Sequence, residues 1–155
     1  MNAAEVIKKN NYFTVVAAKK IPKGDIILKL QGTVSSSPNK YSIQIGAKKH
    51  LLPYSDDPQD VHSLFRFLNH SCDPNSYFDL TNNILIALKD ISIKEEIVFH
   101  YCTTEYEMTS PFKCLCAANN CLSEIKGFKY LTPEVKKQLD AQSAPYLKIM
   151  DKSNL

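Results

Sequence analysis

The segment that most constrains this chain runs from Phe65 to Asn75 and reads FRFLNHSCDPN. It places an apolar stretch directly before a cluster rich in Asn, Ser and Asp, which satisfy local backbone groups in turns. Pro74 fixes its own φ and disfavours the helical region for the preceding residue. The pattern therefore predicts a rigid, polar and non-helical segment. A surface turn alone needs neither the apolar residues leading into it nor its central cysteine, Cys72.

Two later stretches carry further signals. Residues 97–101 form a β-branched and aromatic run, which predicts a strand. Cys114, Cys116 and Cys121 follow with the spacing Cys-x-Cys-x4-Cys. The first two are too close in sequence for a relaxed disulfide, whereas zinc takes four tetrahedral ligands, so three thiols leave one vacancy. The spacing favours a zinc site, and the alternative is that each cysteine is simply a small packed residue.

Composition limits the classes of partner. A chain of 155 residues with 44% hydrophobic residues is long enough for one domain with one core. The net charge is +3, and Arg66 is the single arginine among 19 cationic residues. Arginine is the usual side chain for bidentate recognition of phosphate and guanine. We therefore expect no direct nucleic-acid partner, and the oligomeric state stays unknown.

The N-terminal residues and the cysteine count bear on location. The first 20 residues lack the uninterrupted apolar core of a secretory signal, and no stretch approaches the ~20 apolar residues of a membrane span. We expect no membrane partner and a cytoplasmic or nuclear protein; for a bacterial source, a secreted effector is the alternative. Five cysteines are an odd number, and clustered thiols in a reducing compartment indicate metal ligands before disulfides.

Short strands separated by turns predict a mostly β fold (β-rich α+β). Strands are expected at residues 13–18, 25–30, 41–45, 83–88 and 97–101. Tight turns are expected at residues 21–24 and 81–83, and Lys94 stands where a turn glycine would be suitable. The one predicted helix begins after the N-cap candidate Thr132, has Pro133 at its first position and runs to about Ala141, with frayed residues after it.

The order of these features resembles the SET-domain protein-lysine methyltransferases with a post-SET zinc-binding segment. The resemblance runs from about Val15 to about Tyr130, and its most specific part is the segment from Arg66 to Asn75. It implies a SET-domain fold of several small sheets with a knot-like C-terminal threading, plus a short C-terminal helix. It also divides the chain into a SET domain (1–109), a post-SET zinc segment (110–130) and a C-terminal helix and tail (131–155).

The same resemblance implies two bound groups, S-adenosylmethionine and a structural zinc ion. The implied zinc ligands are Cys72, Cys114, Cys116 and Cys121. The implied cofactor-binding residues are Asn69, His70, Arg66, Tyr12, Phe13, Thr14 and Leu115. His70 is expected to contact the cofactor and not to act as a general base. Cys102 falls outside the zinc pattern and is expected to be a packed thiol.

The implied catalytic residues are Tyr101, Phe99 and Tyr41. Tyr101 is expected to point its hydroxyl at the reacting methyl group. Phe99 lies two residues earlier and therefore on the same strand face. A tyrosine there would hold a water and crowd a methylated amine, so phenylalanine favours di- or trimethylation. The implied substrate is a lysine-containing protein, with a histone tail favoured and other basic proteins left open.

One departure from the family pattern keeps other functions open. The family usually has Gly-x-Gly where this chain has Tyr12-Phe13-Thr14, so a Cβ stands where bare backbone would approach the cofactor. The alternative function is a catalytically weak or inactive SET-like, zinc-stabilised module that binds a peptide. A purely structural zinc protein is a third option, which leaves residues 69–75 unexplained.

Overall fold

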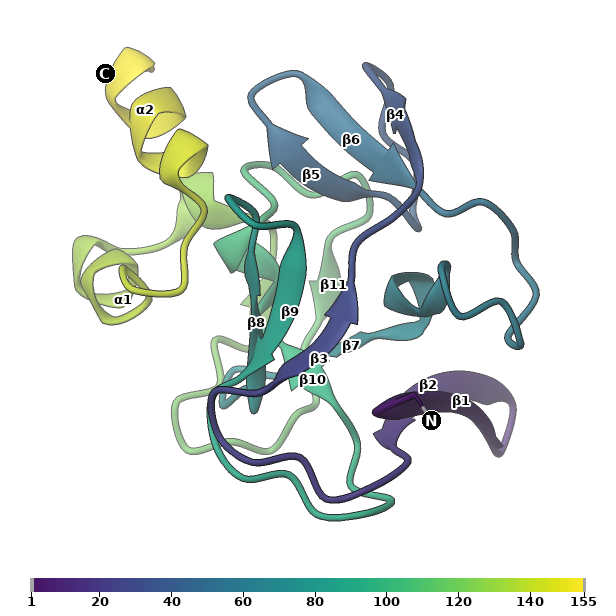
Figure 1. Ribbon diagram of the computed structural model, residues 1–155. Helices are drawn as coiled ribbons and strands as arrows, with labels where there is room; N and C mark the ends of the chain where they lie inside the picture. Colours follow the sequence, from purple (N-terminus) through teal and green to yellow (C-terminus); the bar gives the residue numbers. More distant parts are fainter. Residues whose placement is uncertain (1, 155) are drawn as a thin grey trace.

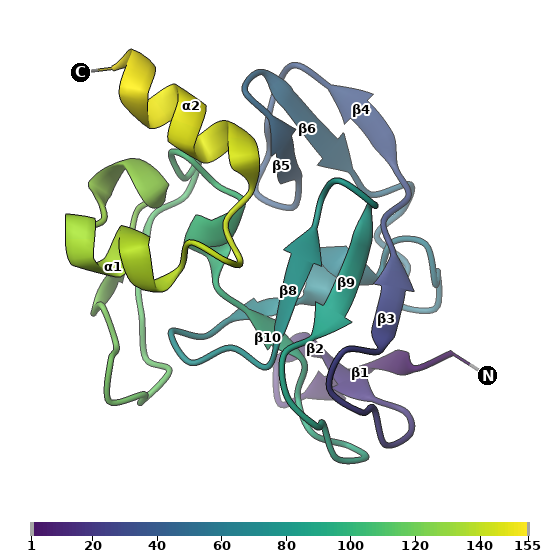
Figure 2. The same ribbon diagram turned by 60° about the vertical axis from the view of Figure 1, so that its left-hand side comes forward.

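A computed structural model describes residues 2–154, which form several small sheets and two short helices (Figures 1 and 2). The strands are β1 (Ala4–Lys9), β2 (Tyr12–Ala17), β3 (Ile26–Lys29), β4 (Thr33–Ser35), β5 (Ile43–Gly46), β6 (Lys49–Leu52), β7 (Asn69–His70), β8 (Ser76–Asp79), β9 (Ile84–Ala87), β10 (Val98–Phe99), β11 (Phe112–Lys113) and β12 (Glu124–Ile125). The α-helices are α1 (Pro133–Gln138) and α2 (Pro145–Ser153), and the 3-10 helices are η1 (Leu64–Phe67), η2 (Tyr101–Thr103) and η3 (Phe128–Tyr130).

Within residues 2–154, the strands pair in antiparallel fashion except at one place. β1 and β2 form a hairpin, β3, β9 and β8 form one three-stranded sheet, and β4, β6 and β5 form another. β11 pairs with β12, while β10 and β7 form a short parallel pair. Two loops from distant parts of the chain also run together, because Ile21 and Ile91 exchange backbone hydrogen bonds of 2.9 and 2.8 Å. The mostly β fold predicted from the sequence is confirmed.

The predicted turns depend on residues with positive φ. Gly24 has φ 89° and Asn83 has φ 54°, in the two turns expected from the sequence. Lys94 has φ 66°, which costs a residue with a Cβ more than it costs glycine. Its amide donates to Ala17 O at 2.8 Å, and that bond holds the strained turn against β2.

The part of the chain that the structure describes contains three buried apolar clusters. The largest lies among β2, β3, η1 and β9 and includes Val15, Leu85, Ile91 and Ile97, each fully buried. A second surrounds the cysteines, with Cys102 completely buried as expected. The third lies under the C-terminal helices and includes Tyr106, Phe128, Ala144 and Leu147. The helices therefore belong to the packed body and lie together on one side of it (Figures 1 and 2).

Several elements differ from those expected. The expectation of frayed residues after the first helix is wrong, because residues 145–153 form α2. Leu147 on α2 is fully buried, and burying a leucine side chain contributes roughly 1.5–3 kcal/mol. Helix α1 has its predicted cap, in which Thr132 Oγ1 accepts from Val135 N at 3.3 Å, but it ends at Gln138. The strands that were not expected are β1, β4, β6, β7, β8, β11 and β12. The three-part domain division and the knot-like threading stay predictions.

No helix within residues 2–154 is both long enough and apolar enough to span a bilayer. Helix α2 is instead joined to the β structure through Tyr146. Its hydroxyl lies 2.6 Å from Gln44 O and 2.8 Å from Thr104 O, and both of those residues are buried. One phenol thus ties the C-terminal helix to β5 and to the segment after η2.

Tyr146→Phe should lower the free energy of unfolding by about 1–3 kcal/mol, because it leaves two buried carbonyls without their shared donor. Urea unfolding followed by circular dichroism measures this change. Tyr130→Phe is the matched control, since that hydroxyl bonds the exposed Glu107 and its loss should change the stability by less than about 0.5 kcal/mol. Equal stability of the two variants would show that Tyr146 does not anchor α2.

Candidate functional site

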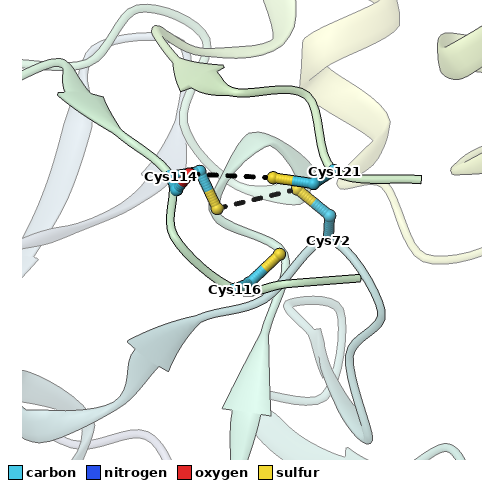
Figure 3. Close-up of side chains that lie close together, drawn as sticks. All are labelled: Cys72, Cys114, Cys116 and Cys121. Carbon is cyan, nitrogen blue, oxygen red and sulfur yellow. Dashed lines mark hydrogen bonds between the residues drawn. The ribbon is translucent and has the colours of Figure 1, made fainter. Parts of the chain in front are cut away.

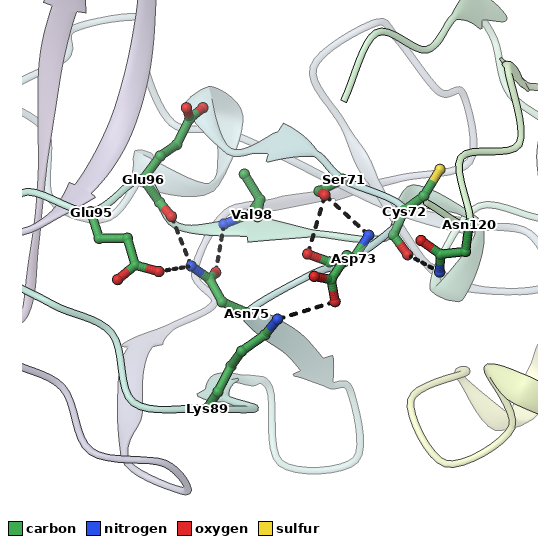
Figure 4. Close-up of polar contacts among 9 residues, drawn as sticks. All are labelled: Ser71, Cys72, Asp73, Asn75, Lys89, Glu95, Glu96, Val98 and Asn120. Atoms are coloured by element: carbon green, nitrogen blue, oxygen red, sulfur yellow. Dashed lines mark hydrogen bonds and ion pairs between the residues drawn. The ribbon is translucent and has the colours of Figure 1, made fainter. Parts of the chain in front are cut away.

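The parallel pairing of β7 with β10 brings the two most informative stretches of the sequence together. Asn69 lies opposite Val98 and His70 opposite Phe99. The expected strand over residues 97–101 is wrong at its end, because β10 stops at Phe99 and Tyr101 begins η2 after His100. The Asn75 side chain fixes this pairing, since it donates to Glu96 O at 2.8 Å and accepts from Val98 N at 2.9 Å (Figure 4).

The remainder of the central segment is held by its own side chains. Ser71 Oγ accepts from Asp73 N at 3.1 Å, Lys89 pairs with Asp73 at 3.1 Å, and Asn120 Nδ2 donates to Cys72 O at 2.9 Å (Figure 4). The polar part after η1 is therefore rigid and non-helical, as the sequence predicted.

A cavity of about 1000 Å³ opens beside this pairing. The cavity wall includes most of the residues that the sequence proposed for catalysis and cofactor binding: Tyr12, Phe13, Tyr41, Arg66, Asn69, His70, Phe99, Tyr101 and Leu115. Thr14 is the exception, because its side chain is buried behind Asn69. The wall also carries two acids that the sequence did not single out, Glu96 and Glu105.

Asn69 is held in one orientation by a small polar cluster. Its Nδ2 donates to Glu96 Oε1 at 2.9 Å and lies 3.2 Å from Thr14 Oγ1, and Thr14 donates to the same Glu96 oxygen at 2.6 Å. Both amide protons of Asn69 are thus engaged. Among the described residues, only its Oδ1 acceptor is left for another group. An acceptor beside a carboxylate is suited to a cationic ammonium.

Tyr101 presents a neutral phenol to the cavity. Its hydroxyl donates to Leu68 O at 2.6 Å, which uses its proton and leaves the oxygen lone pairs free. Burial raises the pKa of Tyr101 above its ordinary value, and the negative charges of Glu105 and Glu96 raise it further. The ring packs against Phe99 with centroids 4.9 Å apart. This side chain is therefore an acceptor of fixed position and not an acid or a base.

His70 is neutral and enclosed by aromatic rings. Its centroid lies 4.7 Å from that of His100 and 5.3 Å from that of Tyr101. Burial, and to a smaller extent His100, lowers the pKa of His70 to about 3. Its Nδ1 accepts from Tyr101 N at 3.1 Å, so the proton is on Nε2, which lies 3.3 Å from Cys72 Sγ. With both ring nitrogens engaged, the imidazole positions its neighbours and is not available as a base.

Arg66 provides the one guanidinium of the cavity wall. Its Cζ lies 3.8 Å from the centroid of the Tyr41 ring, a stacked arrangement that fixes the side chain. Arg66 Nε is buried and has no hydrogen-bond partner within residues 2–154. A buried donor of this kind is free to bind a further acceptor, and a carboxylate fits a guanidinium.

The four predicted cysteine ligands converge on one point (Figure 3). The Sγ atoms of Cys72, Cys114, Cys116 and Cys121 all lie within 4.8 Å of one another, and the first two are 3.9 Å apart. A tetrahedral zinc ion with bonds of about 2.3 Å separates its sulfurs by about 3.8 Å. Burial raises the pKa of Cys114 to about 11, so a cation is needed to hold it as a thiolate. The donor set and its spacing fit zinc.

Comparison with known proteins adds three findings. A model of the SET domain family matches residues 12–102. A protein of Aspergillus flavus named methyltransferase flvH is 30% identical over 128 residues, covering 79% of this chain and 67% of that protein. An Aspergillus oryzae protein named histone-lysine N-methyltransferase, H3 lysine-36 specific, is 38% identical over 71 residues, which are 42% of this chain but only 7% of that protein.

Solved structures agree in fold. Arabidopsis thaliana SUVH6, whose structure contains S-adenosylmethionine, superposes with a TM-score of 0.60 and 18% identity over 78% of this chain and 32% of that one. At this identity the likeness shows the fold.

Zinc content provides the first test of the site. Purified protein should contain about one equivalent of zinc, and Cys116→Ser should lower it below half and expose residues 110–130 to hydrogen exchange, because structural zinc contributes folding free energy directly. Elemental analysis and exchange mass spectrometry measure the two effects. Cys102→Ser is the control that keeps the metal, since Cys102 lies outside the cluster. Wild-type protein that is ordered and free of zinc would overturn the assignment.

Proposed function

This chain belongs to the SET-domain family, and we propose that it transfers a methyl group from S-adenosylmethionine to a lysine side chain of a protein. The observation that carries the proposal is one cavity whose wall combines the oriented Asn69 amide with the neutral Tyr101 hydroxyl. The first provides an acceptor for an ammonium group. The second provides an oxygen acceptor beside an aromatic wall, as transfer of a polarised methyl group requires.

The cavity offers complementary groups for the methyl donor. The Oδ1 of Asn69, next to the Glu96 carboxylate, suits the α-ammonium group of the donor, and Arg66 suits its carboxylate. Leu115 is 91% exposed in the cysteine loop and lies on the cavity wall, where it can cover an apolar ring such as adenine. Contact with the adenine ring would also explain why Leu115, in the loop that zinc would hold, is exposed.

Methyl transfer requires the lysine amine, the methyl carbon and the sulfur to be aligned, and it does not require Tyr101 to act as an acid or a base. S-adenosylmethionine supplies an electrophilic methyl group on a sulfonium. The lysine amine attacks in line with the carbon–sulfur bond, so the protein must hold the amine close and neutral. The Tyr101 hydroxyl oxygen and Leu68 O lie 2.6 Å apart on the wall, and both can accept weak C–H contacts from a polarised methyl group.

The substrate class follows from relatives and is part of the proposal. The Aspergillus oryzae relative is named for histone H3 lysine 36, which supports a histone tail as the substrate. Other basic proteins have the same lysine chemistry. Phe99 on the cavity wall supports di- or trimethylation, because its ring has no hydroxyl to hold a water beside the amine.

A binding module without catalysis is the second candidate, and it rests on Tyr12 and Thr14 in place of the family's glycines. Thr14 is buried and bonded to Asn69 and Glu96, so its Cβ points away from the cavity and obstructs nothing there. Tyr12 and Phe13 are half-exposed on the wall. The arrangement therefore favours the enzyme. Calorimetry with S-adenosylmethionine separates the two, since the binding module would show no heat of binding.

Tyr101→Phe should lower kcat at least about tenfold while zinc content and the unfolding midpoint stay close to wild type, because it deletes one hydroxyl and keeps the ring. A radiolabelled methyl-transfer assay on a histone H3 peptide measures kcat. Tyr54→Phe is the control, since Tyr54 is exposed and outside the cavity. Turnover of Tyr101→Phe equal to the control would make Tyr101 a packing residue only, and no transfer by wild type to any lysine protein would reject the enzyme.

Phe99→Tyr should lower the degree of methylation, for example from dimethyl to monomethyl product. Phe99 is 4% exposed and packs on Tyr101, so a new hydroxyl there would enter the same wall of the cavity and bind a water. Mass spectrometry of the product over time measures the degree. A wild type that stops at one methyl group, or an unchanged product distribution in the variant, would remove Phe99 from the lysine channel.

A further inference from the structure

Glu105 is an acid in the cavity wall that the family pattern does not assign. Its amide donates to Tyr101 O at 2.9 Å, so Glu105 lies one helical turn after Tyr101. Residues four apart on such a turn share a face, and both side chains line the cavity. The carboxyl group thus stands on the same wall as the phenol that the proposed reaction uses.

Within residues 2–154, only one of the two Glu105 carboxylate oxygens accepts hydrogen bonds. Oε1 accepts from Gln44 N at 2.8 Å and lies 3.2 Å from Thr104 Oγ1. Within residues 2–154, Oε2 has no hydrogen-bond partner, while the residue is partly exposed on the cavity wall. One oxygen is therefore a structural anchor, and the other is free for a ligand. A donor that fits it is the N–H of an incoming amine.

We propose that Glu105 accepts the proton of the substrate lysine before methyl transfer. The inference rests on the proposed function, since it needs a lysine in this cavity. The lysine ammonium binds Oε2, and its N–H bond breaks as the proton moves to that oxygen. The nitrogen lone pair then forms the new bond to the methyl carbon, and the carbon–sulfur pair returns to sulfur, which gives S-adenosylhomocysteine and a methylated ammonium. Glu105 finally releases its proton to water.

The electrostatics around Glu105 suit a proton acceptor. Burial raises its pKa to about 7, although the hydrogen bonds from Gln44 and Thr104 oppose the rise. The titratable groups that face it are Tyr101 and Cys102 on η2 and Tyr146 on α2, and burial raises the pKa of each, so all three are neutral. Glu105 therefore titrates near neutral pH, where a base works best.

The alternative is that Glu105 serves only to hold β5. Glutamine distinguishes the two roles, because its Oε1 accepts from Gln44 N as the carboxylate does but its amide nitrogen cannot take a proton. Glu107→Gln is the matched control. Glu107 is two residues away, exposed, and pairs with Lys129 at the surface.

The experiment measures kcat/KM against pH for wild type, Glu105→Gln and Glu107→Gln, with a lysine peptide that wild type methylates. Wild type and Glu107→Gln should lose activity as the pH falls through about 7, because the protonated carboxyl cannot accept a proton. Glu105→Gln should lose about 100-fold in kcat at pH 7. Its activity should rise only toward the pKa of the lysine itself, about 10.4.

Three results would overturn the inference: a Glu105→Gln variant with wild-type kcat and pH profile, one with a raised KM and unchanged kcat, or a wild-type profile that is flat through pH 7. The flat wild-type profile needs no variant, so this test remains valid even if Glu105→Gln fails to fold. Zinc content and calorimetric binding of S-adenosylhomocysteine show whether the variant is folded. Absence of transfer by wild type would instead contradict the proposed function, so the two failures are distinct.

Discussion

The site depends on a parallel strand pair only two residues long on each side. Asn69 and His70 pair with Val98 and Phe99, and so short a ladder has too few bonds to be stable by itself. Hydrogen bonds from side chains stabilise the pairing further. The Asn75 amide bonds both Glu96 O and Val98 N, and the Tyr101 hydroxyl bonds Leu68 O. Residues that look like turn residues in the sequence therefore join two remote segments, and this pairing places an amide, a phenol and an imidazole on one wall.

The same wall combines neutral and charged polar side chains. His70 and Tyr101 are neutral, because burial shifts their pKa values in opposite directions toward the uncharged form. Arg66 and Glu96 add charged side chains to the same wall, and burial raises the pKa of Glu105 there to about 7. A sulfonium ligand would then meet carboxylates at two places and neutral acceptors at its reacting centre, so the charge pattern suits a cationic methyl donor.

The sequence predicted those features that local chemistry determines. The cysteine spacing, the segment from Phe65 to Asn75 and the turns at Gly24 and Asn83 can be inferred from neighbouring residues alone. The contacts that were missed join residues far apart: Thr14 with Glu96 across 82 positions, and Gln44 with Glu105 across 61. No period or turn signal encodes such pairs. The strand pattern of β1 was also missed, because exposed lysines and partly buried residues blur its alternation.

Helix α2 illustrates how a segment without site residues still controls the site. Its Tyr146 hydroxyl contacts Gln44 O and Thr104 O, and these two residues provide the donors, Gln44 N and Thr104 Oγ1, that hold Glu105 Oε1. Gln44 Oε1 also accepts from Tyr106 N at 2.9 Å, which fixes the backbone just after Glu105. A carboxyl anchored by one oxygen keeps the other directed at the cavity. The C-terminal helix therefore helps to position the acid from outside the cavity wall, through the contacts of Tyr146 with Gln44 and Thr104.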